Sequence, residues 1–161
     1  MGGGIRIIVI GAGVVGAACS LSLTEAGADV VVIDRSGIAA ETSSRCEGNV
    51  LVSDKAPGPE ADLAIIANRA WRTLAERLDA ERLPGQPATE FQAKGGVVVA
   101  FGGGGATLED FAVAQRGIGI RAVSLPTPEL RELEPHLSHA VAYGLYYPDD
   151  AQVQPSLATA R

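Results

Sequence analysis

The sequence predicts an α/β fold, and three observations support this prediction. Residues 5–10 form a β-branched run that is apolar except for Arg6, which is typical of a strand buried on both faces of a parallel sheet. A glycine-rich turn follows, and residues 14–26 are small and apolar residues that suit a helix. A second apolar run over 30–33 ends at Asp34. Strand, helix and strand within about 30 residues predict a right-handed parallel βαβ unit.

The rest of the chain predicts further helices and strands, with a change of character near residue 84. Turn formers fill 36–59, where only a short helix near 42–46 is expected. A long helix is expected from Pro59 to Ala80. Its predicted apolar stripe consists of Leu63, Ile66, Ala67, Ala70, Trp71, Leu74 and Leu78. Strands are expected over 97–101 and 140–147. Thr107 and Asp110 resemble a capping box for a helix over 108–116, after a loose glycine tip at 102–105. Short helices are expected after Thr127 and after Pro155.

Composition and charge exclude several classes of protein. The chain has 161 residues, 47% hydrophobic and 20% charged, which indicates a globular protein. The net charge is −6 and no basic block occurs, so nucleic acid is not an expected partner. No membrane segment or targeting signal is expected, and Cys19 and Cys46 are expected to be reduced thiols in the cytoplasm.

The turn after the first predicted strand has the spacing of a dinucleotide-binding motif. Its residues are Gly11, Ala12, Gly13, Val14, Val15 and Gly16. In such a motif the first glycine permits the tight turn, the second lets a diphosphate approach the backbone, and the third allows close packing of helix on strand. The diphosphate then faces unpaired N–H groups at the helix N-terminus. An acidic chain can bind a diphosphate in this way without basic side chains.

Asp34, at the end of the second predicted strand, supports the same interpretation. It follows the motif at close to the expected spacing of about 20 residues, where an acidic side chain accepts hydrogen bonds from a ribose. The glycine turn and Asp34 together predict dinucleotide binding. They leave both FAD and NAD open as the cofactor.

Residues beyond the turn resemble a known family. Leu23, Gly27, Val30 and Asp34 resemble the extended fingerprint of FAD-binding oxidoreductases. Later segments occur in the order found in FAD-dependent amino-acid and amine oxidoreductases of the D-amino-acid oxidase, glycine oxidase and sarcosine oxidase type. These segments are Glu41-Thr-Ser-Ser-Arg-Cys46, Gly48-Asn49, Gly95-Gly-Val-Val-Val99, Glu134-Pro135 and Tyr147-Pro-Asp-Asp-Ala-Gln-Val-Gln-Pro155. The resemblance implies a Rossmann-like FAD-binding βαβ unit with the beginning of a mixed α+β substrate domain, incomplete in this chain.

The resemblance also implies roles for individual residues. Val14 and Val15 would contact the diphosphate through their backbone, Asp34 would bind the ribose, and Arg35 would lie beside the adenosine. Thr42 and Ser43 would lie along the phosphates and the ribityl chain. The segment from Thr42 to Ser44, otherwise typical of a helix cap, would thus contact the cofactor. Residues 45–49 would pass near the isoalloxazine ring. The expected cofactor contacts are Gly11, Ala12, Gly13, Val14, Val15, Gly16, Asp34, Arg35, Thr42, Ser43, Ser44, Gly48 and Asn49.

The activity implied by the resemblance is oxidation of an amino acid or secondary amine at its CH–NH2 or CH–NH group. In this family a hydride passes from the carbon that bears the amine to flavin N5, the imine is hydrolysed, and oxygen or another acceptor reoxidises the flavin. Family members are more than twice as long. The expected division is therefore an FAD-binding segment over 1–83, the first part of a substrate domain over 84–147, and the start of a return segment over 148–161.

No catalytic residue and no metal ligand are expected in this chain; His136 and His139 are expected to lie in a solvated loop. We expect the isolated chain to be inactive, because its activity would need a missing C-terminal half or a partner subunit. Two alternatives stay open: an NAD-dependent Rossmann dehydrogenase, and a nucleotide-binding subunit or remnant that is inactive without a partner chain.

Overall fold

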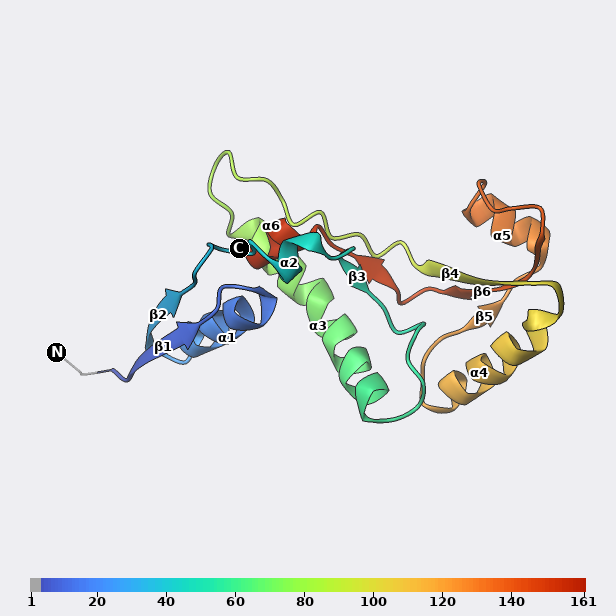
Figure 1. The fold of residues 1–161 in the computed structure, drawn as a ribbon, viewed down its shortest axis with the longest axis horizontal. Helices are drawn as coiled ribbons and strands as arrows, with labels where there is room; N and C mark the ends of the chain where they lie inside the picture. Colours follow the sequence, from blue (N-terminus) through green and yellow to red (C-terminus); the bar gives the residue numbers. More distant parts are fainter. Residues whose placement is uncertain (1–3) are drawn as a thin grey trace. The chain divides into compact units, whose positions relative to one another are not determined.

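The fold was analysed in a computed structural model that describes residues 4–161 (Figure 1). The chain divides into two compact units, each built from separate stretches of sequence. The first unit runs from the N-terminal part of the chain to Gly48 and also includes Ala75–Glu90 and Val153–Arg161. The second unit comprises Asn49–Leu74 and Phe91–Gln152. The two units are defined by contacts within the chain. The predicted functional division into segments over 1–83, 84–147 and 148–161 therefore stays a prediction.

The first unit contains the predicted βαβ arrangement. Strand β1 (Arg6–Ile10) leads into helix α1 (Val14–Glu25), and strand β2 (Asp29–Ile33) then pairs with β1 in parallel along its whole length. Gly27 follows the helix with a φ of +87°, a conformation that favours glycine and ends the helix as expected. The α/β fold and its parallel βαβ unit are confirmed.

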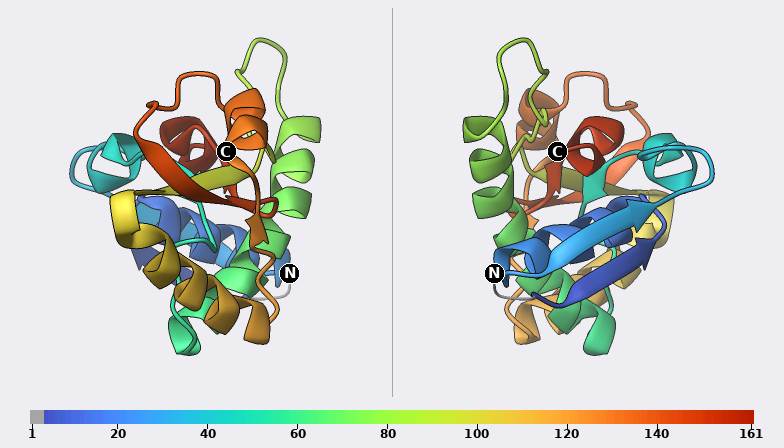
Figure 2. Two further views of the ribbon diagram at one scale, coloured as in Figure 1. Left: turned by 90° about the vertical axis from the view of Figure 1, so that its right-hand side faces the viewer. Right: turned by 90° about the vertical axis from the view of Figure 1, so that its left-hand side faces the viewer.

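Helix α1 covers one face of the two-stranded sheet and leaves the other open (Figure 2). Successive side chains of a strand point to opposite faces. Val9 packs toward the helix, where a side chain on Gly16 would lie 3.5 Å from its Cγ1. Ile8 and Ile10 point the other way and are 59% and 87% exposed. Parallel strands are normally covered on both faces, so this apolar face lacks the layer that usually buries it.

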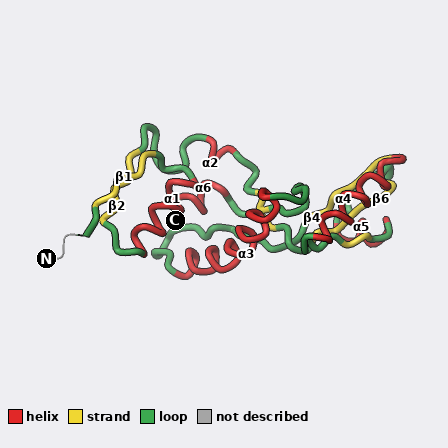
Figure 3. The backbone as a smooth tube through the Cα atoms, turned by 90° about the horizontal axis from the view of Figure 1, so that it is seen from below, coloured by secondary structure: helices red, strands yellow, loops and turns green. Residues whose placement is uncertain are grey.

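The remainder of the first unit consists of short helices and loops. The chain from β2 to helix α2 (Thr42–Arg45) is a loop (Figure 3). Helix α2 lies beside helix α6 (Pro155–Thr159). Gly48 has a φ of +73°, and its carbonyl oxygen accepts a hydrogen bond of 2.9 Å from the N–H of Val153. A Cβ at Gly48 would lie 1.9 Å from the carbonyl oxygen of Val153, so only glycine fits this approach.

The second unit is built on a three-stranded antiparallel sheet. Its order is β4 (Gly96–Phe101), β6 (Val141–Tyr147) and β5 (Val123–Ser124), so β6 is the central strand. Strand β3 (Asn49–Val50) pairs with β7 (Ala151–Gln152) as a separate antiparallel ribbon. The central position explains why β6 carries buried residues along most of its length, whereas β5 is exposed.

The glycine tip after β4 differs from the prediction. Residues Gly102–Gly104 form a 3-10 turn, and helix α4 begins at Gly105 and continues to Gly117. Thr107 therefore lies inside the helix, and the predicted capping box is wrong. Gly105 lies against Tyr143, whose Cβ would be 3.0 Å from a Cβ at position 105. This close packing on β6 favours a helix start at a glycine. The helix predicted after Thr127 is α5 (Thr127–Leu133).

Helix α3 (Pro59–Ala80) has the predicted bounds but presents a different face. Leu63 and Ile66, two members of the predicted apolar stripe, are 67% and 64% exposed. Asn68 is buried instead, because its side-chain amide donates to the carbonyl oxygens of Val50 at 3.1 Å and Asp149 at 2.8 Å. The predicted stripe is wrong in its first half, where Ala67 and Ala70 are exposed as well and two tertiary hydrogen bonds hold Asn68 in the interior. Its second half agrees with the structure, because Trp71 and Leu74 are half-buried and Leu78 is buried.

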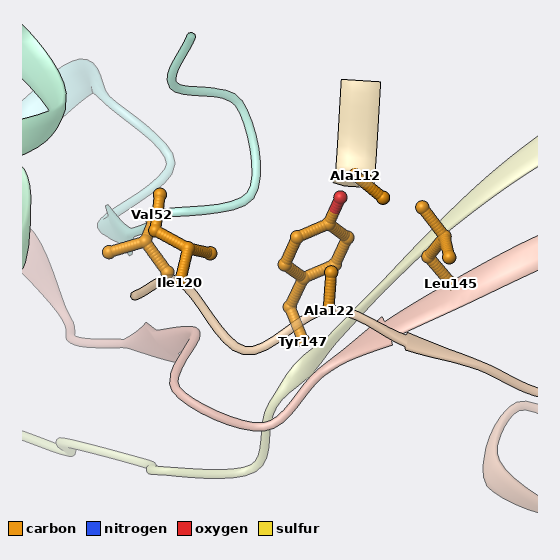
Figure 4. Packing of buried hydrophobic residues seen from close by; sticks show 6 residues of the cluster. All are labelled: Val52, Ala112, Ile120, Ala122, Leu145 and Tyr147. Carbon is orange, nitrogen blue, oxygen red and sulfur yellow. The ribbon is translucent and has the colours of Figure 1, made fainter. Parts of the chain in front are cut away.

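The core of the second unit surrounds Tyr147. The buried cluster consists of Val52, Ala112, Ile120, Ala122, Leu145 and Tyr147, and the tyrosine ring lies among the others (Figure 4). The Tyr147 hydroxyl donates to Gln115 Oε1 at 2.7 Å, and Gln115 Nε2 donates to the carbonyl oxygens of Ser53 at 3.0 Å and Lys55 at 2.8 Å. These bonds satisfy polar groups that would otherwise be costly to bury.

Candidate functional site

The turn from β1 to α1 depends on two of its glycines. Gly11 has a φ of +109°, and its N–H donates to the carbonyl oxygen of Ile33 at 2.8 Å. A Cβ at Gly16 would lie only 1.9 Å from the carbonyl oxygen of Gly11. The backbone of α1 therefore passes closer to the turn than any side chain would permit. The predicted reasons for the first and third glycines agree with this geometry.

The start of helix α1 offers backbone donors. The N–H of Val14 donates to Ser43 Oγ at 3.0 Å, and the N–H of Ala17 closes the first helical turn on the carbonyl oxygen of Gly13 at 2.9 Å. Within residues 4–161, the N–H groups of Val15 and Gly16 have no hydrogen-bond acceptor. Unpaired N–H groups at the positive end of a helix dipole form a site for an anion.

These features fit the diphosphate of a dinucleotide. Gly13 has extended backbone angles and no side chain over the helix end, so an anion can approach the backbone. The first turn of α1 holds no acidic residue that would repel it. Val15, in the first turn of α1, and Ile38, in the loop after β2, are 74% and 63% exposed apolar residues. The residues present therefore suit the predicted ligand.

Asp34 holds the glycine turn in place. Its Oδ2 accepts a hydrogen bond of 2.8 Å from the N–H of Ala12, and its Oδ1 accepts from the N–H groups of Ser36 at 2.7 Å and Gly37 at 3.0 Å. The bond from Ala12, followed by those from Ser36 and Gly37, lowers the pKa of Asp34 below its ordinary value of 3.8. A carboxylate has about four acceptor positions, so these bonds leave it capacity for a ribose hydroxyl. Its role in ordering the turn was not evident from the sequence.

Ala39 is a second contributor that sequence reasoning missed. It is buried, has a φ of +54°, and its N–H donates to the carbonyl oxygen of Ala12 at 2.9 Å. This bond ties the loop after β2 to the glycine turn. Nothing in the sequence marks the position, because alanine rarely adopts a positive φ.

The predicted residues of helix α2 differ in their surroundings. Ser43 is the one that the structure brings to the glycine turn, through its bond from Val14. Thr42 is exposed, and the Ser44 hydroxyl donates to the carbonyl oxygen of Glu41 at 3.0 Å within its own turn. Arg35 is exposed and lies 3.7 Å from the carboxylate of Glu41.

The last two predicted residues fall in different units. Gly48 is buried in the first unit, where its conformation is explained by the approach of Val153. Asn49 is exposed at the start of β3 in the second unit. Their expected proximity to the isoalloxazine ring stays a prediction.

The second unit holds a polar cluster around Glu109. This carboxylate accepts hydrogen bonds from Arg116 at 2.8 Å, from Ser124 at 3.0 Å and from the hydroxyl of Tyr143. The bonds from Arg116 and then Tyr143 lower the pKa of Glu109 to about 2. The cluster joins α4 to both β5 and β6, which indicates a structural role.

Asp150 is buried and also has a structural role. Its Oδ1 accepts hydrogen bonds from the N–H groups of Val52 at 2.8 Å and Ser53 at 3.2 Å. Burial nevertheless raises the pKa of Asp150 above its ordinary value of 3.8. Within residues 4–161, no three His, Cys, Asp or Glu side chains are grouped so that they could hold a metal ion. In the same part of the chain, no helix combines the length and apolar character of a membrane span.

The fold and the glycine turn define an α/β protein of the dinucleotide-binding class. Comparison with known families gives a match over residues 6–161 to the FAD dependent oxidoreductase family. The chain therefore belongs to this family, and the predicted cofactor FAD is confirmed in place of NAD. No curated protein matches the chain.

Several solved structures share the fold. Glycine oxidase from Bacillus cereus ATCC 14579 has 26% sequence identity and a TM-score of 0.84, with 97% of this chain and 41% of that chain covered. Glycine oxidase from Geobacillus kaustophilus has 25% identity and a TM-score of 0.82, with 97% and 43% covered. Iminodiacetate oxidase from Chelativorans sp. BNC1 has 24% identity and a TM-score of 0.79, with 96% and 42% covered. The chain thus spans about two fifths of the length of these proteins.

Proposed function

We propose that this chain binds the ADP half of FAD at the N-terminus of α1. The observation that carries the proposal is the pair of unpaired N–H groups, of Val15 and Gly16, at a helix end that glycine leaves open. They would donate to the diphosphate, and Gly13 would let it approach. Asp34 would accept from the adenosine ribose while it holds the turn.

The other predicted contacts extend this proposal along the cofactor. Ser43 would offer its hydroxyl hydrogen to a phosphate oxygen, because its oxygen already accepts from Val14. Thr42 would lie with Ser43 along the phosphates and the ribityl chain, Ser44 would also contact the cofactor, and Arg35 would lie beside the adenosine. Gly48 and Asn49 would lie near the isoalloxazine ring. The full set of proposed contacts is Gly11, Ala12, Gly13, Val14, Val15, Gly16, Asp34, Arg35, Thr42, Ser43, Ser44, Gly48 and Asn49.

The proposed activity of the whole protein is oxidation of an amino acid or a secondary amine at a CH–NH2 or CH–NH group. Family membership and the glycine oxidases among the similar structures support this substrate class. Bound FAD would supply the hydride acceptor, N5 of the flavin. This chain would bind and orient the cofactor, and no residue of it is assigned to the chemical step.

We further propose that more polypeptide, either a C-terminal half or a partner subunit, is needed for turnover. The exposed face of β1, with Ile8 and Ile10, is where a further layer would pack. The division into an FAD-binding segment over 1–83, a substrate segment over 84–147 and a return segment over 148–161 belongs to this proposal. A cytoplasmic location is proposed from the unpaired, exposed Cys19 and Cys46.

Equilibrium binding of the purified chain to FAD, FMN and NAD tests the cofactor site. We expect FAD to bind and FMN, which lacks the AMP part and therefore has a single phosphate in place of the diphosphate, to bind much more weakly. A Gly13→Ala variant should lose FAD binding while it keeps its circular dichroism spectrum. Equal binding of FMN and FAD, or an unaffected Gly13→Ala variant, would contradict the assignment to the helix end.

Turnover is tested separately, with amino acids and an artificial electron acceptor. We expect the 161-residue chain with FAD to show no amine-dependent reduction of the acceptor. Oxidation of an amino acid by this chain alone would refute the need for further polypeptide. That result would not contradict the proposed cofactor site.

A further inference from the structure

A pocket lined by basic residues lies in the second compact unit, which does not contain the glycine turn. Its volume is about 210 Å3, and three arginines line it. Arg69 and Arg72 stand on the same side of α3, three residues apart. Arg121 comes from the segment between α4 and β5. Three guanidinium groups thus line one hollow, although the net charge of the chain is −6.

Only one of these three charges is neutralised within the pocket. Arg121 forms a two-point ion pair with Asp149, in which its Nε donates to Oδ2 at 2.8 Å. Arg72 donates to the backbone carbonyl oxygen of Asp149 at 3.1 Å and not to its carboxylate. In the described part of the chain, Arg69 has no hydrogen-bond or ion-pair partner. The pocket wall therefore carries two positive charges in excess.

The positive charges of these arginines lower the pKa of Asp149. The hydrogen bond from Arg121 is the main cause that lowers the pKa of Asp149 below its ordinary value of 3.8. The charges of Arg121, Arg72 and Arg69 lower it further. The pocket thus already stabilises one anionic oxygen pair and retains donors for another.

The arginines are attached to a rigid wall. Val52 and Ile120 line the pocket, are each 3% exposed, and belong to the buried core cluster around Tyr147. Asn68 lines the same wall and is fixed by its two hydrogen bonds to backbone carbonyls. A wall that is already ordered does not have to be ordered by the ligand, which lowers the entropic cost of binding.

We propose that this pocket binds a phosphate group, either inorganic phosphate or a small phosphate monoester. A phosphate carries close to two negative charges at neutral pH, which match the two uncompensated guanidinium groups. Arginine donors that converge from two segments suit its several oxygens. The site shares no residue with the proposed cofactor contacts, and all the residues that line it belong to the second compact unit.

Titration of the 15N-labelled chain with sodium phosphate at constant ionic strength tests this proposal. We expect saturable amide shifts at residues 68–72 and 119–121. Arg69→Gln breaks no hydrogen bond and should weaken these shifts about tenfold, as expected for loss of a charged donor. Arg72→Gln should act in the same direction. Arg82→Gln removes the same charge from an exposed position outside the pocket and should leave the affinity unchanged.

Three results would overturn the phosphate site. They are shifts that do not saturate, equal weakening by Arg82→Gln, and binding of malonate as tight as that of phosphate. Amide shifts at residues 13–16 in the same spectra report binding at the N-terminus of α1. They can occur or be absent whether or not phosphate binds in the arginine pocket. The experiment therefore separates this pocket from the proposed cofactor site.

Discussion

Replacing Gly16 with alanine places a methyl carbon 1.9 Å from the carbonyl oxygen of Gly11. Side-chain carbons do not approach other heavy atoms closer than 3.0 Å, so α1 and the turn must separate by about 1 Å. Both atoms belong to the backbone, and no rotamer change relieves the contact. Overpacking of this kind costs about 1–3 kcal/mol, and we expect Gly16→Ala to fall near 3 kcal/mol. FAD affinity should fall with stability, because the unpaired N–H groups move with the helix.

Gly13→Ala is the matched control, with the same methyl group three residues earlier. A Cβ at Gly13 would lie 3.0 Å from Ser43 Oγ, the end of a short side chain that can rotate away. Its φ of −78° is open to alanine. We therefore expect a stability change below about 1 kcal/mol together with loss of FAD binding, because the methyl group covers the diphosphate position.

Urea unfolding followed by circular dichroism measures stability for both variants, and quenching of flavin fluorescence measures binding. The expected pattern is a loss of both properties in Gly16→Ala and a loss of binding alone in Gly13→Ala. If Gly16→Ala unfolds at the same urea concentration as the parent chain and binds FAD equally, the close approach of helix and turn is refuted.

Three further predictions follow from other polar and backbone contacts. The pKa of Glu109 is lowered from 4.5 to about 2, so its bonds stabilise the fold fully above pH 4.5 and are lost as the pH falls toward 2. Glu109→Gln should therefore lower the Tm at pH 7 and flatten its decline between pH 4.5 and 2, and an unchanged Tm profile would contradict this. Asp34→Ala should weaken FAD binding and lower the Tm together, because the Ala12 N–H loses its acceptor. Loss of FAD binding at an unchanged Tm would contradict the structural role and show that Asp34 only binds the ligand. Gly48→Ala should destabilise the first unit, because φ at this position is +73° and the new Cβ would lie 1.9 Å from the carbonyl oxygen of Val153. Hydrogen exchange measures this as reduced protection of the backbone amides of the first unit, and protection equal to that of the parent chain would refute the prediction.

The elements whose boundaries depend on local chemistry were predictable from the sequence. The βαβ unit was found within one residue at its ends, because β-branched runs, a glycine turn and the helix-ending Gly27 act over short distances. Pro59 and its acidic neighbours likewise marked the start of α3. The family resemblance predicted FAD from the order of short segments.

Features that depend on tertiary contacts were not predictable. The burial of Asn68 in α3 depends on hydrogen bonds to carbonyl groups distant in sequence, and the apolar pattern therefore indicated the wrong buried residues in the first half of the helix. The bond from Ala12 to Asp34 and the positive φ of Ala39 arise only when the loop after β2 meets the glycine turn. Secondary-structure propensity and hydrophobic periodicity do not indicate which residues distant in sequence form such hydrogen bonds.

These long-range bonds explain how an acidic chain can offer an anion site. Asp34 accepts from the N–H of Ala12, Ser43 accepts from that of Val14, and Ala39 donates to the carbonyl oxygen of Ala12. The turn is thereby fixed before any ligand binds, and the next two N–H groups, of Val15 and Gly16, stay free for the diphosphate that we propose binds there. A fixed set of dipoles needs no reorganisation on binding. The affinity then depends on geometry and not on net charge, so it should be far less sensitive to salt than binding at the arginine pocket.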